Sequence, residues 1–198
     1  MSALMEIPLF PLRTVLFPGG PLPLRIFEPR YVDMVSRCLK SEIGFGVSLL
    51  SAGEETGAAS MHELGTLASI VDWDQLSDGT LGVEVIGGTR FLLHSSRRQE
   101  DGLNLGQVQW LEAEPAVPLP QRYADMGRLL KGVFEDLGPQ YRHVTPDFDD
   151  AGWVGFRLAE LLPIELEQKQ HCLELFDPVA RLDYLEPLLQ RMGRADAD

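Results

Sequence analysis

The amino-acid sequence predicts an α+β fold, in which a β-rich first part is followed by helices. Up to about Glu114, short apolar runs alternate with polar residues and are separated by glycine and proline, which is typical of strands. From about Gln121, apolar residues recur at the three- and four-residue spacing of amphipathic helices. The proline-rich run between them favours an extended conformation. We therefore expect a unit at residues 1–114, a linker at 115–120 and a helical bundle at 121–198.

The stretch Ile7–Tyr31 carries six prolines among leucines and phenylalanines. Each proline lacks a backbone N–H and has a fixed φ, so these prolines belong at strand starts, sheet edges, turns or a first helical turn. We expect two short strands here, Ile7–Leu12 and Leu22–Phe27, with a turn at Phe17–Gly20. Pro29 occupies the favoured first position of a helix that runs to about Lys40.

Downstream, the region Gly65–Leu111 predicts an antiparallel meander with hairpin turns at Asp78–Gly79, Gly87–Gly88 and Asp101–Gly102. The run Ser51–Ser60 has little to bury and predicts a loop. A sheet of about six or seven short strands avoids exposed edges by curling into a barrel. Besides the two N-terminal strands, the predicted strands are Gly46–Leu50, Thr66–Trp73, Leu81–Ile86, Phe91–Ser95 and Gly106–Leu111.

The second part predicts four helices and an acidic loop at residues 139–150. Pro187 falls inside the last helix, where it should kink the backbone or end the helix early. The predicted helices are Tyr123–Leu137, Gly152–Leu162, Glu165–Phe176 and a helix that starts at Pro178.

Charge and composition restrict the class of protein. The net charge is −13, and dividing the chain at Pro115 leaves both halves negative, which disfavours nucleic acid and anionic membranes as partners. No apolar run approaches the roughly 18 residues of a membrane span, and the first residues do not resemble a secretory signal, so we expect a cytoplasmic protein. Cys38 and Cys172 are accordingly expected to be reduced, mostly buried thiols.

No motif in the sequence predicts catalysis, a cofactor or a metal site. There is no GxxxxGK[ST] phosphate loop, and Gly87–Arg90 has neither the spacing nor the lysine of one. The four histidines are scattered, and His171 and Cys172, as neighbours on a helix, point in different directions. A nucleophilic pair of Cys38 with a histidine is left open. The acidic-aromatic run Asp72–Asp74 and the basic pair Arg97–Arg98 are typical of strand ends.

The sequence PLRTVLFPGGPLPLRIFEPRY, which ends at Tyr31, resembles the opening motif of the Lon substrate-binding (Lon N-terminal) domain family. The resemblance implies a PUA-like β pseudo-barrel, with about six or seven strands and one helix, followed by a C-terminal helical bundle. It also implies recognition of unfolded or exposed polypeptide, in the context of protein quality control. The ATPase and Ser-Lys peptidase of full-length Lon proteases are not recognisable here, so we expect a stand-alone, non-enzymatic module. Further resemblance lies at Leu64–Ile70, Ser77–Thr80, Gly88–Phe91 and Leu158–Leu189.

The element EPRY and the apolar residues before it could border a groove for an extended peptide. The same residues have an ordinary structural reading, in which Glu28 caps the helix, Arg30 pairs with a carboxylate and Tyr31 anchors the helix. A protease or a chaperone is the expected class of protein partner, and adaptor, decoy and holdase roles are left open. The rival functions are an enzyme with an unrecognised site and an RNA-binding PUA-like module. The predicted peptide-binding residues are Leu22, Leu24, Phe27, Glu28, Arg30 and Tyr31.

Overall fold

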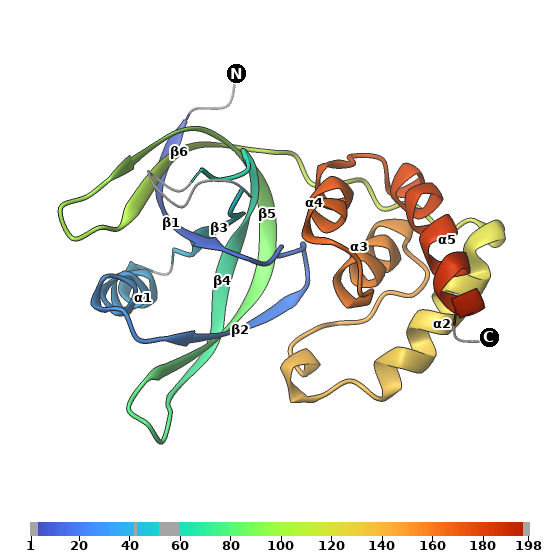
Figure 1. Cartoon of the computed structure of the whole chain (residues 1–198), viewed down its shortest axis with the longest axis horizontal. Helices are drawn as coiled ribbons and strands as arrows, with labels where there is room; N and C mark the ends of the chain where they lie inside the picture. The colour runs from blue at the N-terminus through green and yellow to red at the C-terminus, as the bar shows by residue number, and fades with distance from the viewer. Residues whose placement is uncertain (1–3, 42, 52–59, 196–198) are drawn as a thin grey trace. The chain divides into compact units, whose positions relative to one another are not determined.

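The computed structural model describes residues 4–41, 43–51 and 60–195. Among these residues it contains six strands in one mixed sheet and five α-helices, so the predicted α+β class is confirmed (Figure 1). The chain divides into two compact units, one of residues 1–113 with 140–144 and one of residues 114–139 with 145–198. The elements are β1 (Met5–Leu12), β2 (Pro21–Ile26), α1 (Pro29–Ser41), β3 (Phe45–Leu49), β4 (Leu64–Gln75), β5 (Leu81–Arg98), β6 (Asn104–Trp110), α2 (Ala124–Glu135), α3 (Ala151–Leu161), α4 (Leu166–Glu174) and α5 (Pro178–Ala195), with 3₁₀ turns at Gln121–Tyr123 and Pro139–Tyr141.

The strand order in the first unit is β2-β5-β4-β3-β1-β6. β1 and β3 pair in parallel, and the other neighbours pair antiparallel. The second half of β5 also pairs with β6. Strand pairing therefore runs from β5 through β4, β3, β1 and β6 back to β5, and β2 lies outside this series. One long strand thus pairs with three partners.

The predicted hairpin turn at Gly87–Gly88 is wrong, because β5 runs through both glycines as a single strand. Thr66 of β4 pairs with Arg90, and Ala68 pairs with Gly87. One residue of β4 therefore lies opposite two residues of β5, which is a β-bulge of the kind that bends a strand. The strands predicted at Leu81–Ile86 and Phe91–Ser95 are accordingly the two halves of β5.

Gly87 does not form a turn but lets the backbone of residues 17–20 approach β5 closely. Its N–H donates to Gly20 O at 2.8 Å, and its carbonyl accepts from Gly19 N at 2.7 Å. A Cβ on Gly87 would lie 2.1 Å from Phe17 O, which no side chain could tolerate without movement. Glycine within a strand often marks such an approach.

The other predicted turns are confirmed. Gly79 and Gly102 have φ values of 82° and 85°, in the left-handed region that glycine tolerates, and Gly19 has a φ of 69°. The loop predicted at Ser51–Ser60 lies almost entirely outside the described residues.

The core of the first unit forms where α1 packs against the sheet. The helix buries Tyr31, Met34, Val35 and Cys38, at the spacing of one helix face. These residues share one apolar cluster with side chains of β2, β3, β4 and β5. The strand residues in the cluster are Ile26, Phe45, Val47, Ala68, Val83 and Val85. The helix start after β2 is thereby fixed against the sheet.

In the second unit, the proline-rich run is bonded to the chain that leads into α3. Asp150 caps α3 by accepting from Trp153 N at 2.7 Å, and its carboxylate also accepts from Val117 N at 2.9 Å. Ala151 N donates to Val117 O at 2.8 Å, so the backbone of the run is held from both sides.

Two details of the second part differ from the expectation. The stretch predicted as loop at residues 139–150 begins with the 3₁₀ turn Pro139–Tyr141, and residues 140–144 group with the first unit. Of the two outcomes expected at Pro187, an early end of the helix is wrong, because α5 continues past Pro187 to Ala195. No helix in the described part of the chain is long and apolar enough to cross a membrane.

Candidate functional site

A cluster of arginines in the first unit lines a cavity of about 600 Å³. Five arginines line it, whereas Glu28 is the one acidic residue among its described lining residues. This balance is opposite to that of the chain, whose net charge is −13. We call the cavity the arginine groove. Its lining residues are Phe10, Pro11, Leu12, Arg13, Arg25, Phe27, Glu28, Arg30, Tyr31, Leu50, Met61, Ser96, Arg97, Arg98 and Asn104.

Three of the five arginines are already held by carboxylates. Their pairs are surface or half-buried contacts, which fix the side chains more than they stabilise the fold. The hydrogen bond from Arg97 lowers the pKa of its partner Glu6 below the usual carboxyl value. The pairs are Arg25 with Asp78, Arg30 with Glu28 at 2.6 Å, and Arg97 with Glu6 at 2.9 Å.

The remaining two arginines have no carboxylate partner among the described residues. Arg13 is exposed where β1 ends, and no hydrogen bond or ion pair holds it within the part of the chain that the structure describes. Arg98 is exposed at the end of β5, and its Nε donates to Gly102 O at 3.3 Å. Gly102 O also accepts from Arg30 at 2.8 Å, so one turn carbonyl positions two guanidinium groups. Arg13 and Arg98 are therefore available to an anionic ligand.

The groove also has an aromatic side. Tyr31 is buried, and its ring stacks on Phe10 with the centroids 4.1 Å apart. The Arg30 guanidinium lies 4.7 Å from the Tyr31 ring centroid, a cation–π distance. Burial raises the pKa of Tyr31, so the phenol stays protonated. Phe27, by contrast, is 71% exposed, which is unusual for a phenylalanine and suits contact with a ligand.

The structure brings four of the six predicted binding residues to this groove. They form the contiguous element from Phe27 to Tyr31, without Pro29. Leu22 and Leu24 are half-buried and pack against the apolar core cluster, so structural packing accounts for both. Leu24 also lines a second cavity, of about 490 Å³, together with Trp73 and Glu84.

The other groove arginines are not among the residues that the sequence predicts to bind peptide. In the sequence, the basic pair Arg97–Arg98 is typical of a strand end and does not by itself predict a binding site. Arg13 and Arg25 lie in the same proline-rich motif as Phe27, and this shared motif was the available signal. No sequence pattern shows that the end of β5 lies beside that motif.

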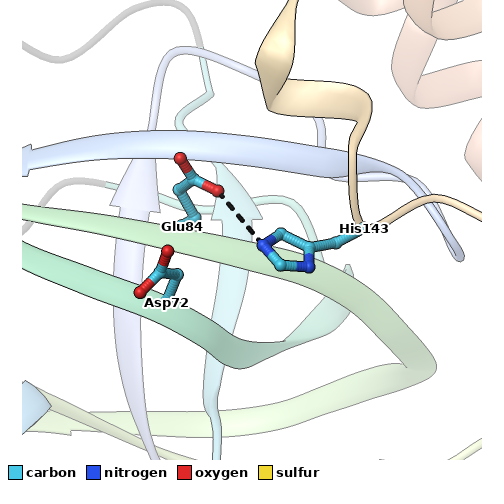
Figure 2. Close-up of side chains that lie close together, drawn as sticks. All are labelled: Asp72, Glu84 and His143. Atoms are coloured by element: carbon cyan, nitrogen blue, oxygen red, sulfur yellow. Dashed lines mark ion pairs between the residues drawn. The ribbon is translucent and has the colours of Figure 1, made fainter.

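A second cluster combines two carboxylates with an imidazole (Figure 2). Both carboxylates line the second cavity. Asp72 of β4 and Glu84 of β5 are cross-strand partners, and His143 comes from the returning segment 140–144. Figure 2 shows Glu84 directed toward His143. Glu84 Oε2 lies 3.7 Å from His143 Nε2. The ligand-type atoms of the three residues lie within 4.8 Å of one another.

Arg142 already supplies a cation to this cluster. Its guanidinium lies 2.5 Å from Asp72 Oδ2 and 3.0 Å from Glu84 Oε2. A divalent ion would have to displace this guanidinium from both carboxylates. The arrangement therefore functions as an ion-pair network that attaches the segment 140–144 to β4 and β5.

Neither cysteine has the environment of a nucleophile. Both are free and buried, which confirms the prediction of reduced thiols. Burial raises the pKa of Cys172 to about 11, and it also raises that of Cys38, so both thiols stay protonated near neutral pH. The Cys38 thiol lies 3.7 Å from Gly44 O, and this contact gives the open Cys–His alternative no support.

Comparison with known proteins identifies the family. The model of the ATP-dependent protease La (LON) substrate-binding domain matches residues 6–191, which is nearly the whole chain. The chain belongs to the LON substrate-binding domain family. The resemblance read from the proline-rich motif is thereby confirmed.

Lon proteins are similar to this chain over nearly its whole length, and one further relative is similar over about half of it. A Lon N-terminal domain protein from Xanthomonas campestris, solved as a crystal structure, is 34% identical, with a TM-score of 0.77 over 92% of this chain and 98% of that one. The Lon protease of Xanthomonas oryzae is 27% identical over 93% of this chain, and protein cereblon of Danio rerio is 29% identical over 56% of it. The N-terminal domain of a Mycobacterium avium complex Lon protease shares the fold, with a TM-score of 0.61 at 14% identity.

The LON-family chain described here spans about a quarter of the length of the Lon proteases that it matches, 23% in the case of Xanthomonas oryzae. The comparisons therefore characterise it as a member of the substrate-binding domain family.

Proposed function

We propose that this LON-family domain binds extended polypeptide in the arginine groove and has no enzymatic activity of its own. The observation that carries the proposal is the exposed ring of Phe27, which stands beside an aromatic-lined cavity in a member of a substrate-binding family. A volume of about 600 Å³ lies within the range of ligand pockets and gives room for a few side chains. Exposed or unfolded segments present such side chains, whereas folded proteins bury them.

Side chains, more than backbone hydrogen bonds, should hold the peptide. β2 stands at the end of the strand order, which would invite the addition of another strand. Pro21 and Pro23 occupy alternate positions of β2 and lack the N–H that an added strand would need. The prolines thus disfavour the pairing of a peptide strand with β2, and the arginine groove supplies the apolar contacts instead.

The expected affinity is modest. Burial of apolar surface contributes about 25 cal/mol per Å², and the ordering of a flexible peptide offsets much of that. We therefore expect micromolar dissociation constants for any one peptide. Weak binding of many segments suits a role as adaptor, decoy or holdase alongside a protease or chaperone in the cytoplasm.

We also infer a PUA-like pseudo-barrel for the first unit and a helical bundle for the second. The return of strand pairing to β5 supports the first inference, and the series of helices α2 to α5 supports the second. On this inference, the boundary lies in the proline-rich run at residues 115–120, and residues 121–198 fold as the bundle.

The test is a Phe27→Ser variant assayed for binding to a reduced, unfolded model protein by fluorescence anisotropy. We expect affinity to fall at least about tenfold, because a buried phenyl ring contributes about 1.5–3 kcal/mol. Phe176→Ser is the matched control, since Phe176 is 55% exposed, lies in the second unit and does not line the groove.

Both variants should keep the circular-dichroism spectrum and melting temperature of the wild type, because both phenylalanines are exposed. The proposal is wrong if the wild type binds no unfolded protein at high micromolar concentration. It is also wrong if the Phe27→Ser and Phe176→Ser variants bind with equal affinity.

A further inference from the structure

We propose that the arginine groove selects acidic polypeptide segments, in which Asp or Glu flanks an apolar side chain. The inference rests on the proposed function and names the class of segment that the groove prefers. It starts from the charge balance of the lining, five arginines against Glu28, in a chain of net charge −13. An acidic segment that is repelled by most of the surface would find its favourable potential here.

The charges that attract such a segment are Arg13 and Arg98. The other three arginines of the groove already face Asp78, Glu28 and Glu6. Arg13 and Arg98 are exposed and have no carboxylate among the described residues, so a ligand carboxylate would complete their pairing. Pairing with the ligand breaks no existing ion pair of the described fold.

The chemistry of arginine favours a carboxylate ligand. A guanidinium group can donate two parallel hydrogen bonds to one carboxylate, which an ammonium group cannot. Gly102 O accepts from both Arg30 and Arg98, and this shared acceptor restricts where the two guanidinium groups lie. A group held in place loses less entropy when the ligand binds.

An apolar residue between the acidic ones completes the match. Phe27, Phe10 and Tyr31 line the same cavity as the arginines, so one ligand segment can contact both kinds of surface. A purely acidic segment would forfeit the apolar burial, and a purely apolar one would leave Arg13 and Arg98 without partners. The preferred segment is therefore mixed, with carboxylates on either side of an aromatic or aliphatic side chain.

The test uses the full chain and two synthetic peptides that share length and apolar residues and differ only in Glu against Gln at the flanking positions. At about 0.05 M salt, where the Debye length exceeds 10 Å, we expect the Glu peptide to bind about tenfold tighter. At about 1 M salt, where that length falls to about 3 Å, the two peptides should bind alike.

The double variant Arg13→Gln/Arg98→Gln should lose about fivefold in affinity for the Glu peptide and keep its affinity for the Gln peptide. Arg128→Gln is the matched control, because Arg128 is exposed on α2 and does not line the groove. The single variant Arg13→Gln should lose about twofold in affinity for the Glu peptide. It replaces the double variant if the double variant does not fold.

The possible outcomes separate this inference from the proposed function. Equal binding of both peptides at low salt overturns the acidic preference and leaves peptide binding intact. If neither peptide binds, both the acidic preference and the proposed peptide binding are wrong. Displacement of the Glu peptide by an equimolar single-stranded oligonucleotide also overturns the inference, since the groove would then take polyanions in general.

Discussion

Arg181 Nη1 donates a hydrogen bond to Glu114 Oε2 at 3.1 Å, and the Arg181 side chain has no exposed surface. Arg181 Nε donates to Cys172 O at 2.9 Å, and the guanidinium lies 3.6 Å from the Phe156 ring centroid. The buried charge is thus satisfied from several sides. Glu114 begins the proline-rich run, so this pair attaches the run to α5 within the second unit.

We predict that Arg181→Met destabilises the protein by about 3–5 kcal/mol, because it leaves the mostly buried Glu114 carboxylate without its cation. Urea unfolding followed by circular dichroism measures the change in the free energy of unfolding. Arg191→Met is the control, since Arg191 is exposed on the same helix, and it should cost under about 0.5 kcal/mol. A cost below about 1 kcal/mol for Arg181→Met would contradict the importance of the pair.

A second prediction concerns the close approach at Gly87. Gly87→Ala should destabilise the protein by about 3 kcal/mol, because its Cβ would lie 2.1 Å from Phe17 O and the backbone would have to move. Gly88→Ala is a matched control in the same strand, since its Cβ would meet nothing closer than Leu67 O at 3.5 Å. Thermal unfolding of the two variants compares them directly. If both shift the melting temperature equally, the contact does not set the cost.

Gly87 also illustrates which part of the fold a local sequence pattern does not determine. Asp78–Gly79 and Asp101–Gly102 are turns that local chemistry determines, and both were predicted correctly. Gly87–Gly88 has a similar local sequence, but the group that requires glycine there is the carbonyl of Phe17, which is distant in the chain. From a single sequence, a glycine that forms a turn looks the same as a glycine that allows a distant backbone segment to approach closely.

The candidate site likewise contains residues that a local sequence pattern predicts and residues that it does not. Phe27, Glu28, Arg30 and Tyr31 were predicted together because they form one contiguous motif at a helix start. Arg98 comes from the end of a strand whose path depends on the bulge in β5 and on its pairing with β6. Its place beside the motif follows from three-dimensional packing, which no local pattern records.

A third prediction concerns stability at alkaline pH. Burial of Tyr123 and its hydrogen bond to Asp183 raise its pKa to about 12, whereas an unfolded tyrosine has a pKa of about 10. The folded state therefore holds the phenol proton more tightly, and the stability this contributes is present below pH 10 and is lost as pH rises toward 12.

Tyr123→Phe removes that contribution. The free energy of unfolding of the variant should accordingly fall less steeply than that of the wild type between about pH 10 and 12. Urea titrations at several pH values in this range measure both slopes. Parallel slopes would show that Tyr123 titrates alike in the folded and unfolded states.

The last prediction concerns nucleic acid, which is the ligand of the rival RNA-binding function. Affinity for duplex DNA or RNA is supplied mainly by arginines and lysines that neutralise phosphates. The groove offers two arginines without a carboxylate partner among the described residues, in a chain of net charge −13. We therefore expect a dissociation constant no tighter than about 10⁻⁵ M at physiological salt, with log K falling against log salt at a slope of about −2. A sub-micromolar constant in a gel-shift assay at that salt would contradict this prediction and favour the rival, because two phosphate contacts cannot supply such affinity.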